Sequence, residues 1–128
     1  DFVSLHVPLM PDTRHMIGAN ELKTMKSTCV LINTARGGLV VENDLVDALK
    51  CGQIRSAGLD VFEVEPTHHD NPIHNLDNVI LSPHIAGSDK LSFEDTGNEA
   101  AKNIIDLFEG SWPDEAVINK QLKGTWKW

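Results

Sequence analysis

The sequence predicts an α/β fold in which helices cover a parallel sheet. Two observations point to this class: short runs rich in Val, Ile and Leu recur along the chain, and segments with apolar residues at helical spacing separate them. Continuous apolar runs are typical of strands that are buried on both faces, as the strands of parallel sheets are. The 128 residues suffice for one compact domain, and the regular alternation of strand and helix favours a parallel sheet within it.

Four strands are expected. The clearest is CVLIN at residues 29–33, which is an almost continuous apolar run. The run FVSLH at residues 2–6 stops before two prolines, which cannot extend a central strand. The other two expected strands are SAGLDV at residues 56–61 and NVILS at residues 78–82.

Three helices are expected between and after these strands. Asn20 can cap the first, which would run through Lys26. The second, about residues 42–50, has apolar positions at helical spacing and is followed by Gly52, a common helix-ending residue. The third is long, about residues 91–109. The tail after it is expected to be extended, with its tryptophans packed on another surface.

Composition and charge argue against several classes of partner. The chain has 11 Lys and Arg against 19 Asp and Glu, for a formal net charge of −8. Nucleic acids and anionic membranes call for clustered basic residues, and here these residues are scattered. No apolar stretch reaches the roughly 18 residues of a membrane span. Cys29 and Cys51 are isolated, which favours reduced thiols in a cytoplasmic protein.

Charged side chains stand at or after the ends of three expected strands. Arg36 follows the second strand, Asp60 and Glu65 the third, and His84 the fourth; positions 36, 60 and 84 are 24 residues apart. Parallel strands point the same way, so residues at their carboxyl ends gather along one edge, where open α/β sheets bind ligands. A guanidinium, two carboxylates and an imidazole are therefore expected to converge.

These side chains suit a substrate that carries a carboxylate beside a carbonyl or hydroxyl. The guanidinium of Arg36 can bind a carboxylate through two parallel hydrogen bonds. The imidazole of His84 can give or take a proton near neutrality, and Glu65 would orient the ring and favour its charged form. No Ser, Cys or Thr carries a nucleophile-elbow motif. Redox chemistry at the hydroxyl carbon, with a hydride carrier, is then a natural reaction.

Each of these residues also has an ordinary structural interpretation. Alone, Arg36 would most often be a solvated loop residue, Asp60 a turn or helix cap, and Glu65 one more acid in an acidic loop. Their joint placement is what brings the catalytic interpretation level with these alternatives. The HHD sequence at residues 68–70 lacks the regular spacing of known metal-ligand sets, so no metal site is expected.

Four motifs in a fixed order carry a resemblance to a known family. They are HVPLMPDTRHMI at residues 6–17, LINTARGGLVVENDLVDAL at 31–49, AGLDVFEVEP at 57–66 and LSPHIAG at 81–87. Together they resemble the NAD-dependent D-isomer-specific 2-hydroxyacid dehydrogenases, over residues 1 to about 110. The resemblance implies a doubly wound, Rossmann-like nucleotide-binding sheet and an oxidoreductase that acts on a small 2-oxo or D-2-hydroxy acid with NAD, NADP not being excluded.

The resemblance also assigns roles. It implies that Arg36, Glu65 and His84 are catalytic and that Asp60 holds the nicotinamide carboxamide. It also implies that Arg36 and His84 contact the dinucleotide, together with Val7, Pro8, Thr34, Ala35, Ala86 and Gly87. NAD-binding transcriptional corepressors share these motifs, so a non-catalytic NAD-binding module or an inactive remnant stays open as an alternative.

One family feature is missing. The GxGxxG turn that seats the pyrophosphate on a helix N-terminus is absent, since no G-x-G occurs in the 128 residues. Residues 1–90 are therefore expected to be the second half of a nucleotide-binding domain, and residues 91–128 a helix and tail that return to a substrate domain. Such a piece alone should bind NAD weakly, turn over no substrate, and associate with another copy or with its missing half.

Overall fold

The computed structural model describes residues 1–127 and confirms the α/β class. Four strands form one sheet in the order β1-β2-β3-β4, and each neighbouring pair is parallel. Every expected strand is present, one or two residues shorter than its apolar run. The strands are β1 (Phe2–Leu5), β2 (Val30–Asn33), β3 (Ser56–Leu59) and β4 (Val79–Leu81).

The strands end in register. Leu5 pairs with Asn33, Asn33 with Leu59, and Leu59 with Leu81, so that the last residues of all four strands form one row across the sheet. The loops that begin at residues 6, 34, 60 and 82 therefore start side by side. We call this edge of the sheet the C-terminal rim.

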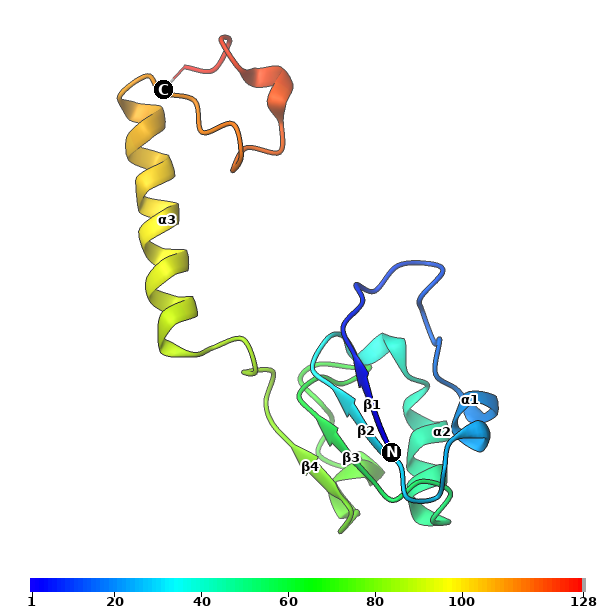
Figure 1. Ribbon diagram of the computed structural model, residues 1–128. Coiled ribbons are helices and arrows are strands. Elements are labelled where there is room, and N and C mark those ends of the chain that lie inside the picture. Colours follow the sequence, from blue (N-terminus) through cyan, green and yellow to red (C-terminus); the bar gives the residue numbers. More distant parts are fainter. Residues whose placement is uncertain (128) are drawn as a thin grey trace. The chain divides into compact units, whose positions relative to one another are not determined.

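Two helices lie on the same face of the sheet (Figure 1). They are α1 (Ala19–Thr24) and α2 (Glu42–Lys50). The expected apolar positions of α2 are buried and join Leu31 of β2 in one continuous core. Burial of an aliphatic side chain contributes about 1.5–3 kcal/mol, so this core, rather than helix propensity, holds these short helices in place.

The start of α1 differs from the expectation. The helix begins at Ala19, after Gly18, and Asn20 does not cap it. A carboxylate oxygen of Asp44 accepts a hydrogen bond from the backbone N–H of Ala19 at 2.8 Å, and Glu21 accepts one from Gly18 at 2.9 Å. A residue of α2 thus satisfies the first turn of α1, and such a partner is too distant in sequence for a local capping rule to find.

The opposite face of the sheet carries exposed apolar side chains. Phe2 of β1 is 73% exposed and Ile80 of β4 is 79% exposed. Within residues 1–127, β1 pairs on one side only. This face and this edge are available to a covering segment, as half of a doubly wound sheet requires.

The chain divides into two compact units, Asp1–Ala86 and Gly87–Trp128. The second contains α3 (Lys90–Phe108), which starts and ends within one residue of the expected helix. Asp89 caps it by accepting hydrogen bonds from the N–H groups of Leu91 at 2.9 Å and Ser92 at 3.1 Å. None of its residues is buried. No helix in the described part of the chain is both long and apolar enough to cross a bilayer.

The expectation of an extended tail is wrong. After α3 the chain forms turns, including a 3-10 turn at Lys120–Leu122. Lys123 contacts both carboxylate oxygens of Asp114, at 2.8 and 2.6 Å, and the N–H of Trp126 donates to the carbonyl of Leu122 at 3.0 Å. The bond between Trp126 and Leu122 uses backbone groups that a strand would offer to a partner. Trp112 is half-buried and Trp128 lies outside the described residues, so the packing expected for the tryptophans stays a prediction.

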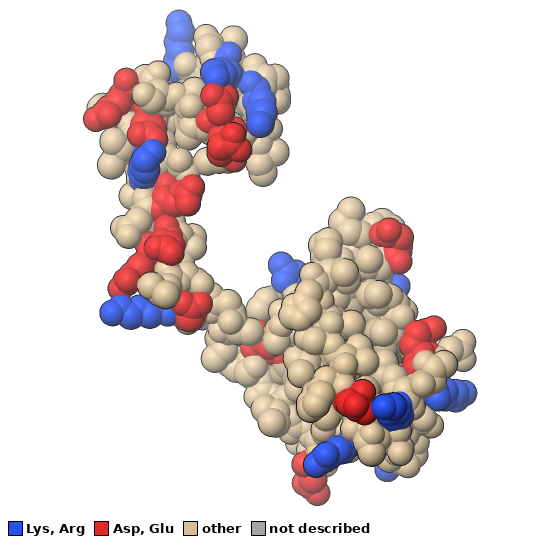
Figure 2. Space-filling view, in the orientation of Figure 1, with Lys and Arg blue, Asp and Glu red and all other residues tan. Residues whose placement is uncertain are grey.

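Charged side chains are mixed on the surface in view. Figure 2 shows Lys and Arg scattered among Asp and Glu, without a broad basic patch on that face. This distribution agrees with the acidic balance of the sequence. It offers no extended positive surface there for a phosphate backbone.

Candidate active site

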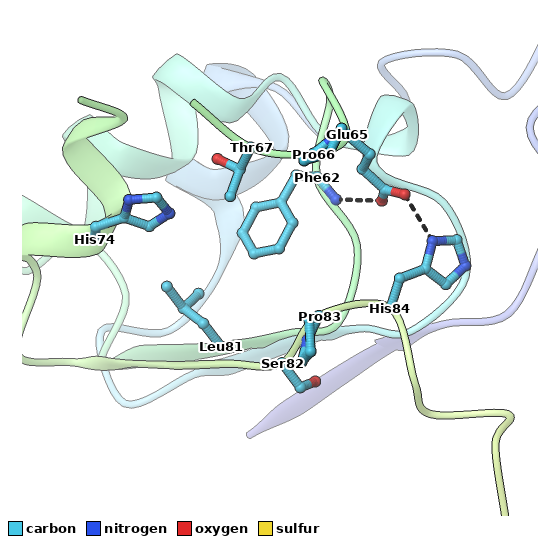
Figure 3. A pocket seen from close by; sticks show the side chains of 9 residues that line it. All are labelled: Phe62, Glu65, Pro66, Thr67, His74, Leu81, Ser82, Pro83 and His84. Atoms are coloured by element: carbon cyan, nitrogen blue, oxygen red, sulfur yellow. Dashed lines mark hydrogen bonds and ion pairs between the residues drawn. The ribbon is translucent and has the colours of Figure 1, made fainter. Parts of the chain in front are cut away.

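Glu65 and His84 form a hydrogen-bonded pair at the C-terminal rim (Figure 3). Nδ1 of His84 lies 2.7 Å from Oε2 of Glu65. Because an ionised carboxylate only accepts hydrogen bonds, Nδ1 carries the proton of this bond. The other carboxylate oxygen accepts the N–H of Phe62 at 2.8 Å. The ring of His84 is thus held through one nitrogen, and Nε2 forms no hydrogen bond within the described residues.

Glu65 is ionised at neutral pH. Partial burial alone would raise the pKa of its carboxyl group, but the hydrogen bonds from Phe62 and His84, with the positive charges of His84 and Arg36, outweigh burial and lower it below its ordinary value. Arg36, Glu65 and His84 lie in the loops that follow β2, β3 and β4; Glu65 and His84 line one hollow, and Arg36 lines another. The three residues predicted to be catalytic therefore meet at one rim.

Arg36 leaves the end of β2 on a turn that is fixed by Asn33. Asn33 is 1% exposed. Its side-chain amide donates to the carbonyl of Arg36 at 2.9 Å and accepts from the N–H of Ala35 at 3.1 Å. Arg36 itself is exposed, and its guanidinium reaches back to the Ala35 carbonyl at 2.6 Å. Asn33 was not among the residues predicted from the sequence, although a polar residue that ends a buried apolar run is a signal of such a role.

The residue after Arg36 is Gly37, and the structure shows why no side chain fits at this position. A Cβ atom at this position would lie 1.9 Å from the carbonyl carbon of Phe62 and 2.5 Å from the nitrogen of Glu63. Only glycine lets the chain after β2 come this close to the chain after β3. The close approach brings the Arg36 loop against the segment that leads to Glu65.

Asp60 is buried at the end of β3, with 2% of its surface exposed. Its carboxylate accepts hydrogen bonds from the hydroxyl of Ser82 and from the N–H groups of Ile85 at 2.9 Å and Ala86 at 2.8 Å. Burial would raise the pKa of Asp60, but these three donors and the nearby His84 outweigh it and lower it. The carboxylate is therefore charged and tied to the loop that carries His84.

Two hollows lie along the rim. One, of about 690 Å³, includes Phe62, Glu65 and His84 in its wall. The other, of about 720 Å³, is lined by His6, Val7, Pro8, Leu9, Ala35 and Arg36. Four residues predicted to contact the cofactor thus share one hollow. Among the rest, Thr34 is exposed, the N–H of Ala86 bonds to Asp60, and Gly87 begins the second unit.

Glu42, at the start of α2, fixes the acidic loop that contains Glu65. Its carboxylate accepts hydrogen bonds from the N–H of Glu63 at 3.1 Å and from the side-chain amide of Asn71 at 2.6 Å. The position of Glu42 in the first turn of a helix favours a negative charge there. Sequence spacing gave no signal for this contact, which joins residues 21 and 29 positions apart.

The His68–Asp70 segment gathers three possible ligand atoms within 4.8 Å of one another. All three residues are exposed, and Nδ1 of His68 already bonds to Asp70 at 2.7 Å. No metal site was predicted here, because the spacing of the HHD sequence is not that of known ligand sets. Spacing in the sequence gave no sign that these three side chains lie close together.

Comparison with known proteins places this rim in a family. The profile described as "D-isomer specific 2-hydroxyacid dehydrogenase, NAD binding domain" matches residues 1–86. The chain belongs to this family. The match ends where the first unit ends, so all four strands and the predicted catalytic residues lie inside the family's NAD-binding domain.

Individual relatives agree with this family assignment. The chain is 47% identical to glyoxylate reductase of Thermococcus litoralis over 122 residues, 95% of this chain and 36% of that protein. It is 45% identical to D-3-phosphoglycerate dehydrogenase of Methanocaldococcus jannaschii over 117 residues, 91% of this chain and 22% of that protein. The NAD-complexed D-isomer specific 2-hydroxyacid dehydrogenase of Lactobacillus delbrueckii ssp. bulgaricus has a TM-score of 0.82 and 34% identity, covering 88% of this chain and 38% of that structure. The chain thus spans between 22% and 38% of the length of these relatives.

Proposed function

We propose that the protein containing this chain transfers a hydride between NAD(H) and a small 2-oxo or D-2-hydroxy acid. The observation that carries the proposal is the Glu65–His84 pair, at 2.7 Å, on the rim that also presents Arg36. Membership of the 2-hydroxyacid dehydrogenase family supplies the reaction class. Relatives named glyoxylate reductase support a small oxo acid as the substrate.

Arg36 would bind the carboxylate of the substrate. Its side chain is exposed at the rim, and the turn built on Asn33 holds its backbone. The guanidinium now donates to the Ala35 carbonyl, and its remaining N–H groups can form two parallel bonds to an acid. Binding the acid group fixes the neighbouring carbonyl carbon at a defined distance from His84.

His84 would move the proton. NAD(H), when bound, supplies or accepts the hydride at the substrate carbon. In the reducing direction, Nε2 of His84 donates a proton to the carbonyl oxygen, and the C=O bond becomes CH–OH. In the oxidising direction, the same nitrogen accepts the hydroxyl proton. Glu65, bonded to Nδ1, would orient the ring and stabilise its positive charge in the protonated state.

The residues of the second hollow fit a nucleotide. Val7, Pro8 and Ala35 give it apolar walls beside Arg36, as nucleotide sites usually have. Thr34, Ala86 and Gly87 are proposed as further contacts. Asp60 would reach the nicotinamide carboxamide through the one acceptor position that its three present donors leave free, since a carboxylate has about four such positions.

The remaining assignments concern the whole protein. We propose that the first unit is half of a nucleotide-binding domain and that the second returns toward a substrate domain. The exposed face with Phe2 and Ile80 supports association with that missing half or with a second copy. The unpaired thiols Cys29 and Cys51 support a cytoplasmic location.

Arg36→Lys in the full-length protein tests the proposal. A charged hydrogen-bonding partner contributes about 1.5–3 kcal/mol, so kcat/KM for glyoxylate with NADH should fall about 10- to 150-fold. The matched control is Arg55→Lys, which changes an exposed arginine at the other end of the sheet and should leave kcat/KM unchanged. Equal activity of Arg36→Lys and wild type, or a wild-type protein that binds NADH but reduces no 2-oxo acid, would favour the non-catalytic NAD-binding alternative.

A further inference from the structure

His84 has an unusual backbone conformation. Its φ angle is +57°, in the left-handed region that residues other than glycine seldom adopt. Such a conformation persists only where the surrounding structure enforces it, and it often marks a functional position. The question is which contact enforces it here.

The contact that enforces the conformation of His84 is made by the two residues that follow it. The N–H groups of Ile85 and Ala86 both point at Asp60, the first to Oδ1 at 2.9 Å and the second to Oδ2 at 2.8 Å. Successive backbone N–H groups around a left-handed residue form a concave site for an anion. The anion in this site is a side chain of the same protein, supplied by the end of β3.

Asp60 is itself rigidly held. It is 2% exposed, its own N–H donates to the carbonyl of Asn33 at 3.0 Å, and its carboxylate also accepts the hydroxyl of Ser82. It thus connects the end of β2, through β3, to both sides of His84. Glu65 is the other charged group that contacts His84, through Nδ1 at 2.7 Å. Within the described residues, its carboxylate bonds to the N–H of Phe62 and to the His84 ring, not to the backbone of residues 82–86.

We propose that Asp60 is a positioning residue for the acid/base histidine: its carboxylate holds the turn at residues 82–86 and so places the His84 imidazole against Glu65. This inference rests on the proposed function, and it goes beyond a contact with the nicotinamide. Three of the acceptor positions of the carboxylate serve the loop. A contact with the cofactor would use the acceptor position of the carboxylate that remains.

The role requires a carboxylate. Both oxygens accept from fixed backbone N–H groups, so an amide at this position would turn an NH₂ group toward one of these donors. Asp60→Asn keeps the size of the side chain but loses at least one of the two bonds. Ser82→Ala removes one donor and keeps both backbone bonds, so it tests the hydroxyl separately. Asp77→Asn, an exposed acid that precedes β4, is the matched control.

The experiment combines kinetics with hydrogen exchange in the full-length protein. Asp60→Asn should lower kcat for glyoxylate about 100-fold, the usual effect of a displacement of about 1 Å, and change KM for NADH less than about threefold. Exchange of at least one of the Ile85 and Ala86 amides should become at least about tenfold faster, because at least one of them loses its buried acceptor. Ser82→Ala should stay within about fivefold of wild type in kcat, and Asp77→Asn should match wild type in both measurements.

Retained kcat with a raised KM for NADH would overturn the proposal, because Asp60 would then act on the cofactor alone. Unchanged exchange at Ile85 and Ala86 would overturn it whatever the kinetics. If Asp60→Asn does not fold, the wild type decides: its Ile85 and Ala86 amides must exchange more slowly than those of the exposed loop at residues 68–70, and equal rates would refute the anchor. A wild type that reduces no 2-oxo acid would refute the proposed function, while the exchange measurement would still test the anchor.

Discussion

Replacement of Gly37 by alanine should damage both stability and catalysis. The new Cβ would lie 1.9 Å from the carbonyl carbon and oxygen of Phe62. Ordinary contact between carbon atoms is about 3.5–4.0 Å, so the two backbones would have to separate by about 1.5 Å or more. Overpacking costs about 1–3 kcal/mol. We expect the upper end, about 3 kcal/mol or about 150-fold in the folding equilibrium, because backbone cannot rotate away as a side chain can.

The catalytic effect of Gly37→Ala follows from the displacement of the two loops that carry Arg36 and Glu65. Phe62 donates its N–H to Glu65, and Gly37 follows Arg36 directly. A separation of these loops by about 1.5 Å should lower kcat/KM for a 2-oxo acid at least about 100-fold, since a misplacement of about 1 Å can already cost that much. The stability effect is measured as a shift in the urea midpoint, and the catalytic effect by NADH absorbance under conditions in which the variant is folded.

Gly38→Ala is the control for Gly37→Ala. Its Cβ would meet the two terminal methyl groups of Leu9 at 3.0 and 3.3 Å, and these can rotate away, so we expect a cost of about 1 kcal/mol or less. A Gly37→Ala protein as stable and as active as Gly38→Ala would refute the argument that glycine is required for the close approach of the two loops.

Two further predictions concern the same rim. Asn33→Ala should destabilise the protein by about 2 kcal/mol, because it leaves the Ala35 N–H and the Arg36 carbonyl without their partner; it should also lower kcat/KM, and normal thermal stability would contradict it. The pKa of Glu65 lies below its ordinary value of 4.5, so its stabilising contribution is present above that pH and is lost as the pH falls through the lowered pKa. The stability advantage of wild type over Glu65→Gln, from urea midpoints between about pH 7 and pH 2, should therefore shrink below about pH 5; an advantage that grows on acidification would contradict the assignment.

The parts of the fold that could be predicted from the sequence depend on local pattern. The apolar run that became β2 and the helical spacing of Leu45, Val46 and Leu49 each reflect burial within one element, and the structure has both. The gathering of Arg36 and His84 at one rim followed from the parallel direction of the strands alone. Regular periodicity and one topological rule were sufficient there.

The contacts that could not be predicted join distant residues through specific atoms. Asp44 caps α1, and Glu42 holds the loop before Glu65. Neither partner leaves a pattern in sequence, because a hydrogen bond requires geometry rather than periodicity. The tail differs from the expectation for a related reason: an extended tail would have needed a neighbouring strand, and local backbone bonds such as that from Trp126 to Leu122 form turns instead. The hydrogen bonds from Ile85 and Ala86 to Asp60 could not be predicted from the sequence for the same reason.

The aligned strand ends have a consequence for the evolution and redesign of such proteins. Leu5, Asn33, Leu59 and Leu81 lie in one row, so the starting points of the loops that carry Arg36, Glu65 and His84 are set by the hydrogen-bond ladder and not by the length of the crossovers between the strands. Insertions at the amino-terminal ends of the strands should therefore leave these starting points in place, even where they cost stability. A slip of one residue in any ladder would instead move the start of a loop about 3.3 Å along the strand and turn the side chains of that strand to the other face of the sheet.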